Sequence, residues 1–320
     1  MNSRRKIPVI AGPTAVGKTE YAIRIARALG GEIVSADSMQ IYRYMDIGSA
    51  KPDAREQAAA RHHLVDAVDP RTPCSAAEYR DMAKKCIREI FERNRLPVLC
   101  GGTGLYISAL IYDMDFSNSP RDDGLRQHYQ RIAEEQGRKY LHSLLEKIDP
   151  DAAARIHPNN VKKVIRAIEA AKHGEKIPAF ENSFRPAADY EYILIGLRRP
   201  REELYDRINR RVDVMMDSGL EDEVRRLVGM GLTAEDNAMK GIGYKEMIGF
   251  LNGEYDRETA KELIRRNSRR YAKRQMTWFR RYPDMRWFDI TRDTEPSELL
   301  TEILLFLKER GIPEETGKQL

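Results

Sequence analysis

Eight consecutive residues have the types and the spacing of a phosphate-binding P-loop: Gly12, Pro13, Thr14, Ala15, Val16, Gly17, Lys18 and Thr19. Glycines let the backbone amides curl around phosphate oxygens, and a helix that begins here directs its positive end at the anion. Lys18 adds positive charge, and the hydroxyl of Thr19 can hold a Mg²⁺ ion. We predict that these residues bind phosphate groups and that Thr19 is a metal ligand. The alternative is a glycine turn that only packs a strand on a helix.

Two further polar groups each follow an apolar run. Asp37, Ser38, Met39 and Gln40 come directly after residues 32–36, and the segment GGTG with Thr103 follows residues 96–100. If these runs are parallel strands, both groups lie at the same sheet edge as the P-loop. Asp37 is then a carboxylate near the phosphates, able to accept a proton or to assist magnesium binding. An Asp at a strand end is as often only a helix cap, so both interpretations stay open.

Alternating strands and helices must position these groups. Short apolar runs at residues 7–11, 32–36, 96–100, 192–197 and 286–290 are typical of buried strands, and residues 19–29 have helical periodicity. Strands that alternate with helices indicate a parallel sheet, whose ligands gather at the carboxyl ends of the strands. The predicted fold class is α/β, with a P-loop NTPase-like parallel sheet core.

A helical insertion interrupts this core. Residues 125–136, 139–147, 151–156 and 161–173 carry helical periodicity and few strand signals. We therefore expect residues 1–115 and 189–320 to form the catalytic core with a basic C-terminal helix. Residues 116–188 should form a helical insertion domain.

The composition favours a globular protein in water over a membrane or secreted protein. Of 320 residues, 41% are apolar and 33% charged, which suits a water-facing globule. No apolar run could span a bilayer, and the N-terminus lacks a secretory signal, so the expected location is the cytoplasm, without a membrane partner. The net charge of +5 fits a metabolic enzyme as well as an RNA-binding protein.

The positive charge is concentrated near the C-terminus. Residues 261–281 contain nine Lys or Arg residues and a single acid, Glu262. Ile264, Tyr271 and Trp278 recur every seven residues and would form an apolar stripe. Two basic rows flank that stripe on a helix: one is Arg265, Arg269 and Lys273, the other Arg266, Arg270 and Arg274. Such a helix could dock on the core and present a track for an RNA backbone, or it could be a merely solvated face.

The sequence resembles the tRNA dimethylallyltransferases, also called isopentenyl-tRNA transferases. The matching stretches run from residue 12 to about 281 and are GPTAVGKT, SADSMQIYRYMDIGSAKP, HHLVD, GGTGLYISAL, DPDAAARIHPNN, LYDRINRRVDVM, GIGYKE and YAKRQMTWFRR. The resemblance implies that the P-loop serves dimethylallyl diphosphate rather than hydrolysing ATP. It also implies transfer of the dimethylallyl group to the exocyclic amine of the adenine 3′ of the anticodon in tRNA, with release of diphosphate.

The resemblance also implies residue roles. Asp37 would be the base on the adenine amine, which makes Asp37, Thr103 and Lys18 the predicted catalytic residues. Arg207 would help to hold the diphosphate, with Arg211 as the nearby alternative. The predicted tRNA-binding residues are Asp37, Ser38, Met39, Gln40, Thr103, Arg126, Lys162, Lys163, Val164, Ile165, Arg166, Lys240, Gly243, Tyr244, Lys245, Lys273, Arg274 and Arg280.

Some of these positions carry a second interpretation. The turn at residues 240–245 offers an aromatic face for an unstacked base, or it connects two helices and packs Tyr244 inside. The sequence reads HPNNVKK where the family commonly has HPND and then QR, so a lysine point charge replaces an arginine fork at Lys162. Tyr44 stands where the family usually has glycine.

The predicted reaction is alkyl transfer with Mg²⁺ as cofactor. A neutral aromatic amine is a weak nucleophile, so stabilising the departing diphosphate should supply most of the catalysis. The partners would be the tRNA anticodon loop and dimethylallyl diphosphate, and the protein is expected to be a monomer. The alternatives are a small-molecule or nucleotide kinase, which would use the same loop with ATP, and a P-loop RNA-binding switch without transfer chemistry.

Overall fold

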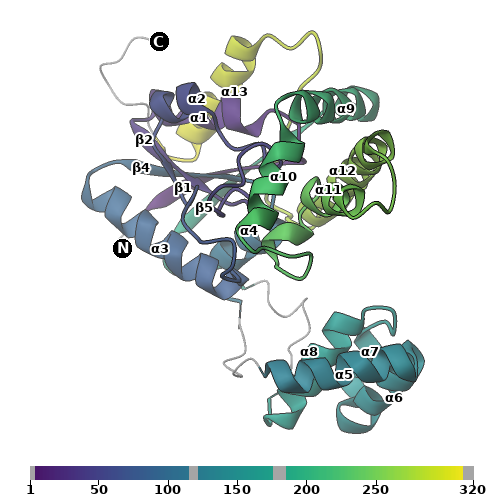
Figure 1. Cartoon of the computed structure of the whole chain (residues 1–320). Helices are drawn as coiled ribbons and strands as arrows, with labels where there is room; N and C mark the ends of the chain where they lie inside the picture. The colour runs from purple at the N-terminus through teal and green to yellow at the C-terminus, as the bar shows by residue number, and fades with distance from the viewer. Residues whose placement is uncertain (1–3, 115–121, 176–184, 313–320) are drawn as a thin grey trace. The chain divides into compact units, whose positions relative to one another are not determined.

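A parallel sheet forms the centre of the larger of two compact units. The structure, a computed structural model, describes residues 4–114, 122–175 and 185–312, and within them six strands pair in the order β3-β2-β4-β1-β5-β6 (Figure 1). The strands are β1 (Lys6–Ala11), β2 (Gly31–Ser35), β3 (His62–His63), β4 (Leu96–Gly101), β5 (Glu191–Arg198) and β6 (Arg286–Asp289). Every pair is parallel, which confirms the predicted α/β class.

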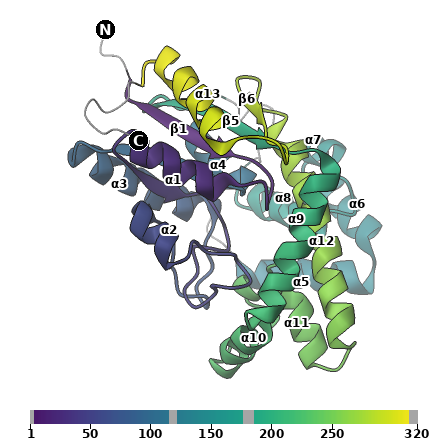
Figure 2. The same ribbon diagram turned by 90° about the horizontal axis from the view of Figure 1, so that it is seen from above.

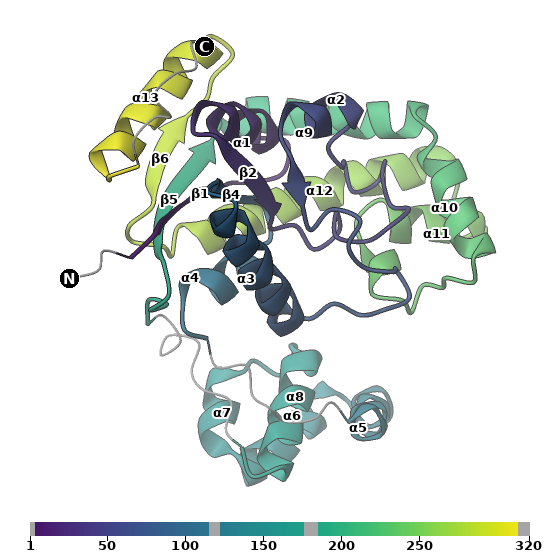
Figure 3. The same ribbon diagram turned by 90° about the vertical axis from the view of Figure 1, so that its left-hand side faces the viewer.

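Helices cover both faces of this sheet (Figure 3). On one face α1 (Lys18–Ala28) and α13 (Pro296–Glu309) pack in the same hydrophobic core as Ile10, Ile33 and Ile195. On the other lie α3 (Ala76–Glu92) and α4 (Gly104–Ile111), whose Tyr79 and Tyr106 rings stack with centroids 3.9 Å apart. Strand β1 lies between β4 and β5 and is buried from Ile7 to Ala11, as expected for a central parallel strand. The loops at its carboxyl end therefore start from a fixed support.

Between β5 and β6 the chain forms a layer of helices beside the sheet (Figure 2). They are α9 (Arg201–Asp217), α10 (Leu220–Gly229), the short 3-10 helix η2 (Ala238–Lys240), α11 (Tyr244–Leu251) and α12 (Arg257–Phe279). The short helix α2 (Ala54–Ala59) precedes β3. Two carboxylates, Glu223 of α10 and Glu246 of α11, are buried in this layer. Buried carboxylates need hydrogen-bond donors, so they mark where the layer is held in register.

The second unit is helical. The chain divides into one unit of Met1–Ile111 with Ala187–Leu320 and another of Tyr112–Pro186. The second contains α5 (Asp123–Glu135), α6 (Arg138–Ile148), α7 (Pro150–Arg155) and α8 (Val161–Lys172). Asp122 and Asp149 cap α5 and α7, and Leu141, Leu145 and Ile168 lie in its own core. The predicted start of the insertion, residue 116, lies outside the described residues.

None of the helices within the described ranges combines the length and the apolar character needed to cross a bilayer.

Candidate active site

The P-loop joins β1 to α1 and encloses the amine of Lys18. Gly17 caps α1 with φ at +114°, a left-handed conformation that favours glycine, and Ala15 also has a positive φ of +62°. Lys18 Nζ donates to Pro13 O at 2.8 Å, so the amine points back into the loop. Burial lowers the pKa of Lys18 to about 8, although Cys100 and Asp37 oppose the shift. An anion bound in the loop would restore the preference for the charged amine.

Arginines support the P-loop from outside. Arg207 Nε donates to Ala15 O at 2.8 Å, and Arg199 Nε donates to Val16 O at 2.9 Å. These contacts satisfy two carbonyls of the loop and do not engage its amides. Burial, together with the neighbouring Arg207, lowers the pKa of Arg211. Arg207 thus contacts the P-loop directly and Arg211 is its close neighbour, and both stay candidates for holding a diphosphate.

The ends of β2 and β4 are connected through Thr103 and Ser38. Thr103 Oγ1 accepts from Ser38 N at 2.9 Å and donates to Ser38 Oγ at 3.2 Å. Asp37 Oδ1 accepts from Met39 N at 2.9 Å and from Gln40 N at 3.3 Å, so the carboxylate does cap the following turn. Among the described residues no hydrogen bond reaches Asp37 Oδ2. One carboxylate can therefore fulfil both interpretations, with Oδ1 in the turn and Oδ2 available to a substrate.

Gln275 of α12 links the basic helix to the P-loop, a role that the sequence analysis missed. Its Oε1 accepts from Thr14 N at 2.9 Å, and its Nε2 donates to Gly102 O at 2.8 Å. A Cβ on Gly102 would lie 2.5 Å from this Nε2, which explains a glycine here. Burial raises the pKa of Tyr271, one turn earlier, to about 12, and Asp37 adds to the shift. The sequence did contain a signal for this role. Gln275 is a polar residue four positions after Tyr271, on the helix face that is otherwise apolar.

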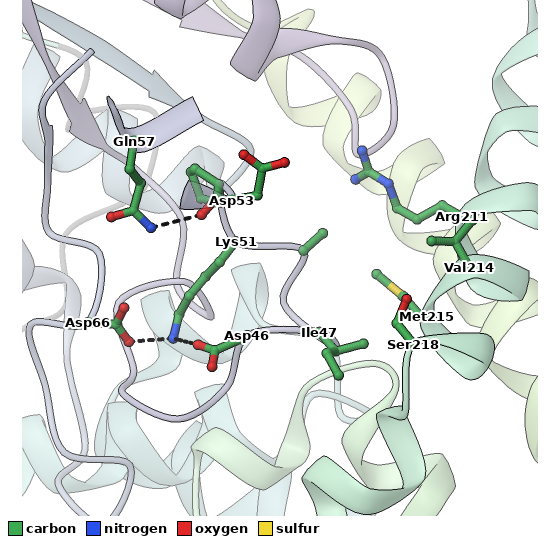
Figure 4. Close-up of a pocket in the computed structure, with 12 residues that line it drawn as sticks. Asp46, Ile47, Lys51, Asp53, Gln57, Asp66, Arg211, Val214, Met215 and Ser218 are labelled. Carbon is green, nitrogen blue, oxygen red and sulfur yellow. Dashed lines mark hydrogen bonds and ion pairs between the residues drawn. The ribbon is translucent and has the colours of Figure 1, made fainter. Parts of the chain in front are cut away.

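A cavity of about 650 Å³ opens between α9 and the loops that follow β2 (Figure 4). Arg211, Val214 and Met215 line it from α9, and Ile47 and Lys51 line it from the loop. It combines apolar side chains with two cations, Arg211 and Lys51, and three carboxylates, Asp46, Asp53 and Asp66. Arg211 follows Arg207 by one turn of α9, and Arg207 donates to Ala15 O of the P-loop, so the cavity is next to the P-loop site.

The basic helix differs from the prediction on one of its two rows. Arg265 and Lys261 pair with Asp213 of α9, and Arg269 donates to Asn209 of the same helix at 2.7 Å. The sequence indicated that Glu262 is the single acid near these basic residues. In the structure α9 adds a second acid, Asp213, which the sequence of the helix itself does not show. Residues exposed to solvent on α12 and at its C-cap include Arg266, Arg270, Lys273, Arg274 and Arg280.

Tyr244 is a correction to the predicted tRNA-binding set. Its side chain is fully buried, and its hydroxyl donates to Glu223 Oε1 at 2.8 Å. The ring therefore cannot stack on a base, and the interpretation of a helix-connecting turn is the right one for this residue. Lys240 and Lys245 are exposed on the same turn. Gly243 is buried and its N–H donates to Glu246 Oε2 at 2.8 Å, so it is a second correction to the predicted set.

The helical unit gives a similar correction. Val164 and Ile165 are buried in the core of that unit, so their side chains are not available to RNA. Lys162, Lys163 and Arg166 flank them on α8 and are exposed. Arg126 donates to both oxygens of the buried Glu169, at 2.9 and 2.7 Å for its shortest contacts. The role of Arg126 at RNA stays a prediction.

The oxygen donors at the P-loop fit a metal that is held mainly by a substrate. No cluster of three or more His, Cys, Asp or Glu side chains that could hold a metal occurs in the part of the chain that the structure describes. Thr19 lies in the first turn of α1, and the Asp37 hydrogen bonds to the following turn engage Oδ1 alone. Mg²⁺ prefers oxygen ligands and is often held by one or two protein groups plus substrate phosphates. This donor set fits such a site.

Comparison with known proteins adds a family to this geometry. A sequence model of the family described as IPP transferase matches residues 40–282, well over half of the chain. The chain belongs to the IPP transferase family. The predicted family resemblance is therefore confirmed.

Relatives in this family match the chain along nearly all its length. A tRNA dimethylallyltransferase of Alkaliphilus oremlandii is 50% identical over 303 residues, which cover 94% of this chain and 96% of that protein. A tRNA dimethylallyltransferase of Clostridioides difficile is 47% identical over 307 residues, covering 95% and 99%.

Solved structures of the family share the fold. A full-length tRNA isopentenylpyrophosphate transferase from Bacillus halodurans is 43% identical with a TM-score of 0.73, covering 96% of this chain and 97% of that one. A eukaryotic dimethylallyltransferase acting on tRNA is 27% identical with a TM-score of 0.81, covering 98% and 81%.

Proposed function

We propose that this protein transfers a dimethylallyl group from dimethylallyl diphosphate to the exocyclic amine of the adenine 3′ of the anticodon in tRNA. The observation that carries the proposal is Gln275, because it connects the P-loop and the Gly102 turn to a helix whose outer face is basic. The same helix, α12, thus contacts the phosphate-binding loop and presents a basic surface to solvent. Family membership and relatives named tRNA dimethylallyltransferase support it further.

The proposed chemistry divides between two groups of residues. The adenine nitrogen forms a bond to the first carbon of the donor, the bond from that carbon to the diphosphate oxygen breaks, and the nitrogen loses a proton. Lys18, the loop amides and Arg207 or Arg211 stabilise the charge on the leaving diphosphate. Asp37 Oδ2 orients the amine and accepts its proton. Thr103 fixes the backbone beside Asp37 through Ser38 N, at 2.9 Å.

A Mg²⁺ ion fits this proposal through Thr19. When bound, the ion would supply positive charge to the diphosphate oxygens as the donor bond breaks. The chain itself would contribute the hydroxyl of Thr19, and oxygens of the bound diphosphate would supply further ligands.

The tRNA would be bound by both units. On the core these are Lys273, Arg274 and Arg280 of the basic helix and Lys240 and Lys245 of the turn before α11. On the helical unit they are Arg126, Lys162, Lys163 and Arg166. The adenine must leave its stack to reach Asp37, Ser38, Met39 and Gln40. All these groups come from one chain, so we propose that a single copy, working in the cytoplasm with tRNA, suffices.

The lowered pKa of Lys18 predicts a pH dependence of donor binding. Below about 8 the amine is charged and attracts the diphosphate, whereas above that pH it is increasingly neutral. Donor affinity should therefore fall as the pH rises through 8 and beyond. Calorimetric titration of the free protein with dimethylallyl diphosphate over a pH series measures this. In Lys18→Ala this fall in donor affinity with rising pH should be absent. An equal fall in that variant would mean that another group titrates.

The exposed row of α12 predicts a salt-dependent contact with the tRNA backbone. Replacing Lys273 and Arg274 together by alanine should weaken tRNA binding and reduce the slope of affinity against salt by about one unit per phosphate contact removed. A matched control replaces two exposed lysines elsewhere on the core unit, Lys85 and Lys308. If both double variants have the wild-type slope, the basic helix is only solvated.

A labelling experiment tests the proposal against the kinase alternative. The purified protein is incubated with tRNA and dimethylallyl diphosphate labelled in the prenyl group, and separately with ATP labelled at the γ-phosphate. We expect prenyl label on tRNA and no transfer from ATP. Phosphate transfer to tRNA or to a small acceptor without prenyl transfer would reject the proposal, and RNA binding without either transfer would favour the RNA-binding switch.

A further inference from the structure

Glu223 of α10 is a buried carboxylate that binds the backbone of a loop. It is 1% exposed. Its Oε2 accepts from Asp46 N and from Ile47 N, both at 2.8 Å, and its Oε1 accepts from Gly48 N at 3.0 Å. Tyr244 Oη donates to the same Oε1 at 2.8 Å. Within the described ranges no Lys or Arg side chain pairs with it, so these four donors alone satisfy the charge.

Three successive amides that converge on one point form a typical anion-binding nest. Here the nest at residues 46–48 is filled by the protein's own carboxylate. A buried carboxylate held by several N–H groups is well stabilised, but removing its acceptors would leave buried amides unpaired. The conformation of the loop therefore depends on Glu223. The fit is tight at Gly48, where a Cβ would lie 2.5 Å from the Tyr244 ring.

The same loop forms one wall of the 650 Å³ cavity. Asp46 and Ile47 line that cavity opposite Arg211 (Figure 4). Asp46 also pairs with Lys51 at 2.7 Å, and Asp66 pairs with Lys51 as well. The Lys51 side chain is only 4% exposed, so its position is set by these carboxylates. Moving residues 46–48 would thus shift the apolar Ile47 and the charged Lys51 cluster relative to Arg211.

We propose that Glu223 is a positioning residue for the donor. By filling the nest it fixes the wall that faces Arg211, and it thereby sets the affinity for the prenyl diphosphate without touching either substrate. Val214, Met215 and Ile47 give the cavity apolar walls for a prenyl chain, and Arg211 supplies a positive charge. Of the three carboxylates that also line it, Asp46 and Asp66 pair with Lys51, and Asp53 caps α2. This inference rests on the proposed prenyl transfer.

The test compares Glu223→Gln with a matched control, Glu246→Gln. Glu246 is another buried carboxylate of the same helical layer, and it accepts from Gly243 N and Asn267 Nδ2 but has no contact with residues 46–48 among its described hydrogen bonds. The Glu223→Gln side chain keeps the shape of the carboxylate but turns an amide NH₂ toward backbone N–H groups. We expect KM for dimethylallyl diphosphate to rise about tenfold in Glu223→Gln. The kcat at saturating donor and KM for tRNA should stay near wild type, and Glu246→Gln should keep the wild-type donor KM.

The split between these constants decides the result. If Glu223 only stabilises the fold, both variants should have a lower melting temperature, and their KM values for the donor should not differ from each other. A folded Glu223→Gln protein with wild-type donor KM, or with the same change as Glu246→Gln, overturns the proposal. Absence of prenyl transfer by the wild-type protein would instead refute the proposed function.

A milder variant covers the case in which Glu223→Gln does not fold. Tyr244→Phe removes one hydroxyl donor and keeps the buried ring in place. We expect a smaller rise of the donor KM in the same direction, of about threefold, with unchanged KM for tRNA. An unchanged donor KM in folded Tyr244→Phe, alongside an unfolded Glu223→Gln, would mean that the network serves stability alone and would overturn the proposal.

Discussion

Replacing Lys18 by alanine should reduce prenyl transfer at saturating donor by at least about a hundredfold. Negative charge develops on the diphosphate as its bond to carbon breaks, and a preorganised cation at that place is worth about this much in similar sites. The fold should tolerate the change, because the amine's described partner is a single carbonyl, Pro13 O at 2.8 Å. Single-turnover rates with labelled donor and saturating tRNA measure the effect.

Two controls separate this effect from a general loss of structure. The melting temperature of Lys18→Ala should stay close to that of the wild type, and its affinity for tRNA should be unchanged, since the basic helix is intact. Lys85→Ala, which removes an exposed lysine of α3, should transfer at the wild-type rate. A Lys18→Ala protein with more than half of the wild-type rate would contradict the assignment of the P-loop to the donor.

Asp37→Asn should slow the chemical step by about 10² to 10⁴-fold while leaving stability nearly unchanged. The amide oxygen of asparagine can still accept from Met39 N and Gln40 N, so the turn that Asp37 Oδ1 caps is retained. What is lost is a negative oxygen at Oδ2 that can take the proton. Single-turnover rates at saturating tRNA and donor, with thermal unfolding on the same samples, measure both quantities.

The result distinguishes the two roles of this carboxylate. Asp37→Ala removes the cap as well as the base, so it should be both slow and less stable, by about 1 kcal/mol. If Asp37→Asn keeps a near-normal rate while Asp37→Ala loses stability, Asp37 is a cap and another group accepts the proton.

Local patterns predicted the sheet and the phosphate loop because both are encoded by neighbouring residues. The apolar run before Gly12 and the helical run after Lys18 gave β1 and α1, and the parallel sheet followed from the alternation of strands and helices. The helices of the insertion were predicted to within about two residues at most ends, since caps such as Asp122 and Asp149 are visible in sequence.

Contacts between distant elements could not be predicted in the same way. Arg265 pairs with the nearby Glu262 but also with Asp213, 52 residues away on α9, so the basic run is neutralised in space more than its sequence indicates. Tyr244 is buried because Glu223 and Gly48 meet it, and neither lies on its own helix. Gln275 contacts Thr14, 261 residues away. Periodicity identifies a face of a helix but not its neighbour.

Tyr44 has a backbone conformation that favours glycine. It has a φ of +66°, a left-handed conformation in which a glycine is strain-free and a tyrosine is not. Its side chain is 50% exposed, so no burial compensates for the strain. Nothing in the structure explains the tyrosine.

The most direct test is the chemical identity of the product on one defined tRNA. An unmodified transcript with adenine 3′ of the anticodon is incubated with the protein, dimethylallyl diphosphate and Mg²⁺. The tRNA is then digested to nucleosides, which are identified by mass spectrometry. We expect one prenylated adenosine per tRNA, with an equal amount of diphosphate released. A matched transcript with guanine at that position should give neither. An unmodified adenosine together with ATP-dependent phosphorylation, or prenylation of both transcripts, would contradict the proposed reaction or its proposed target.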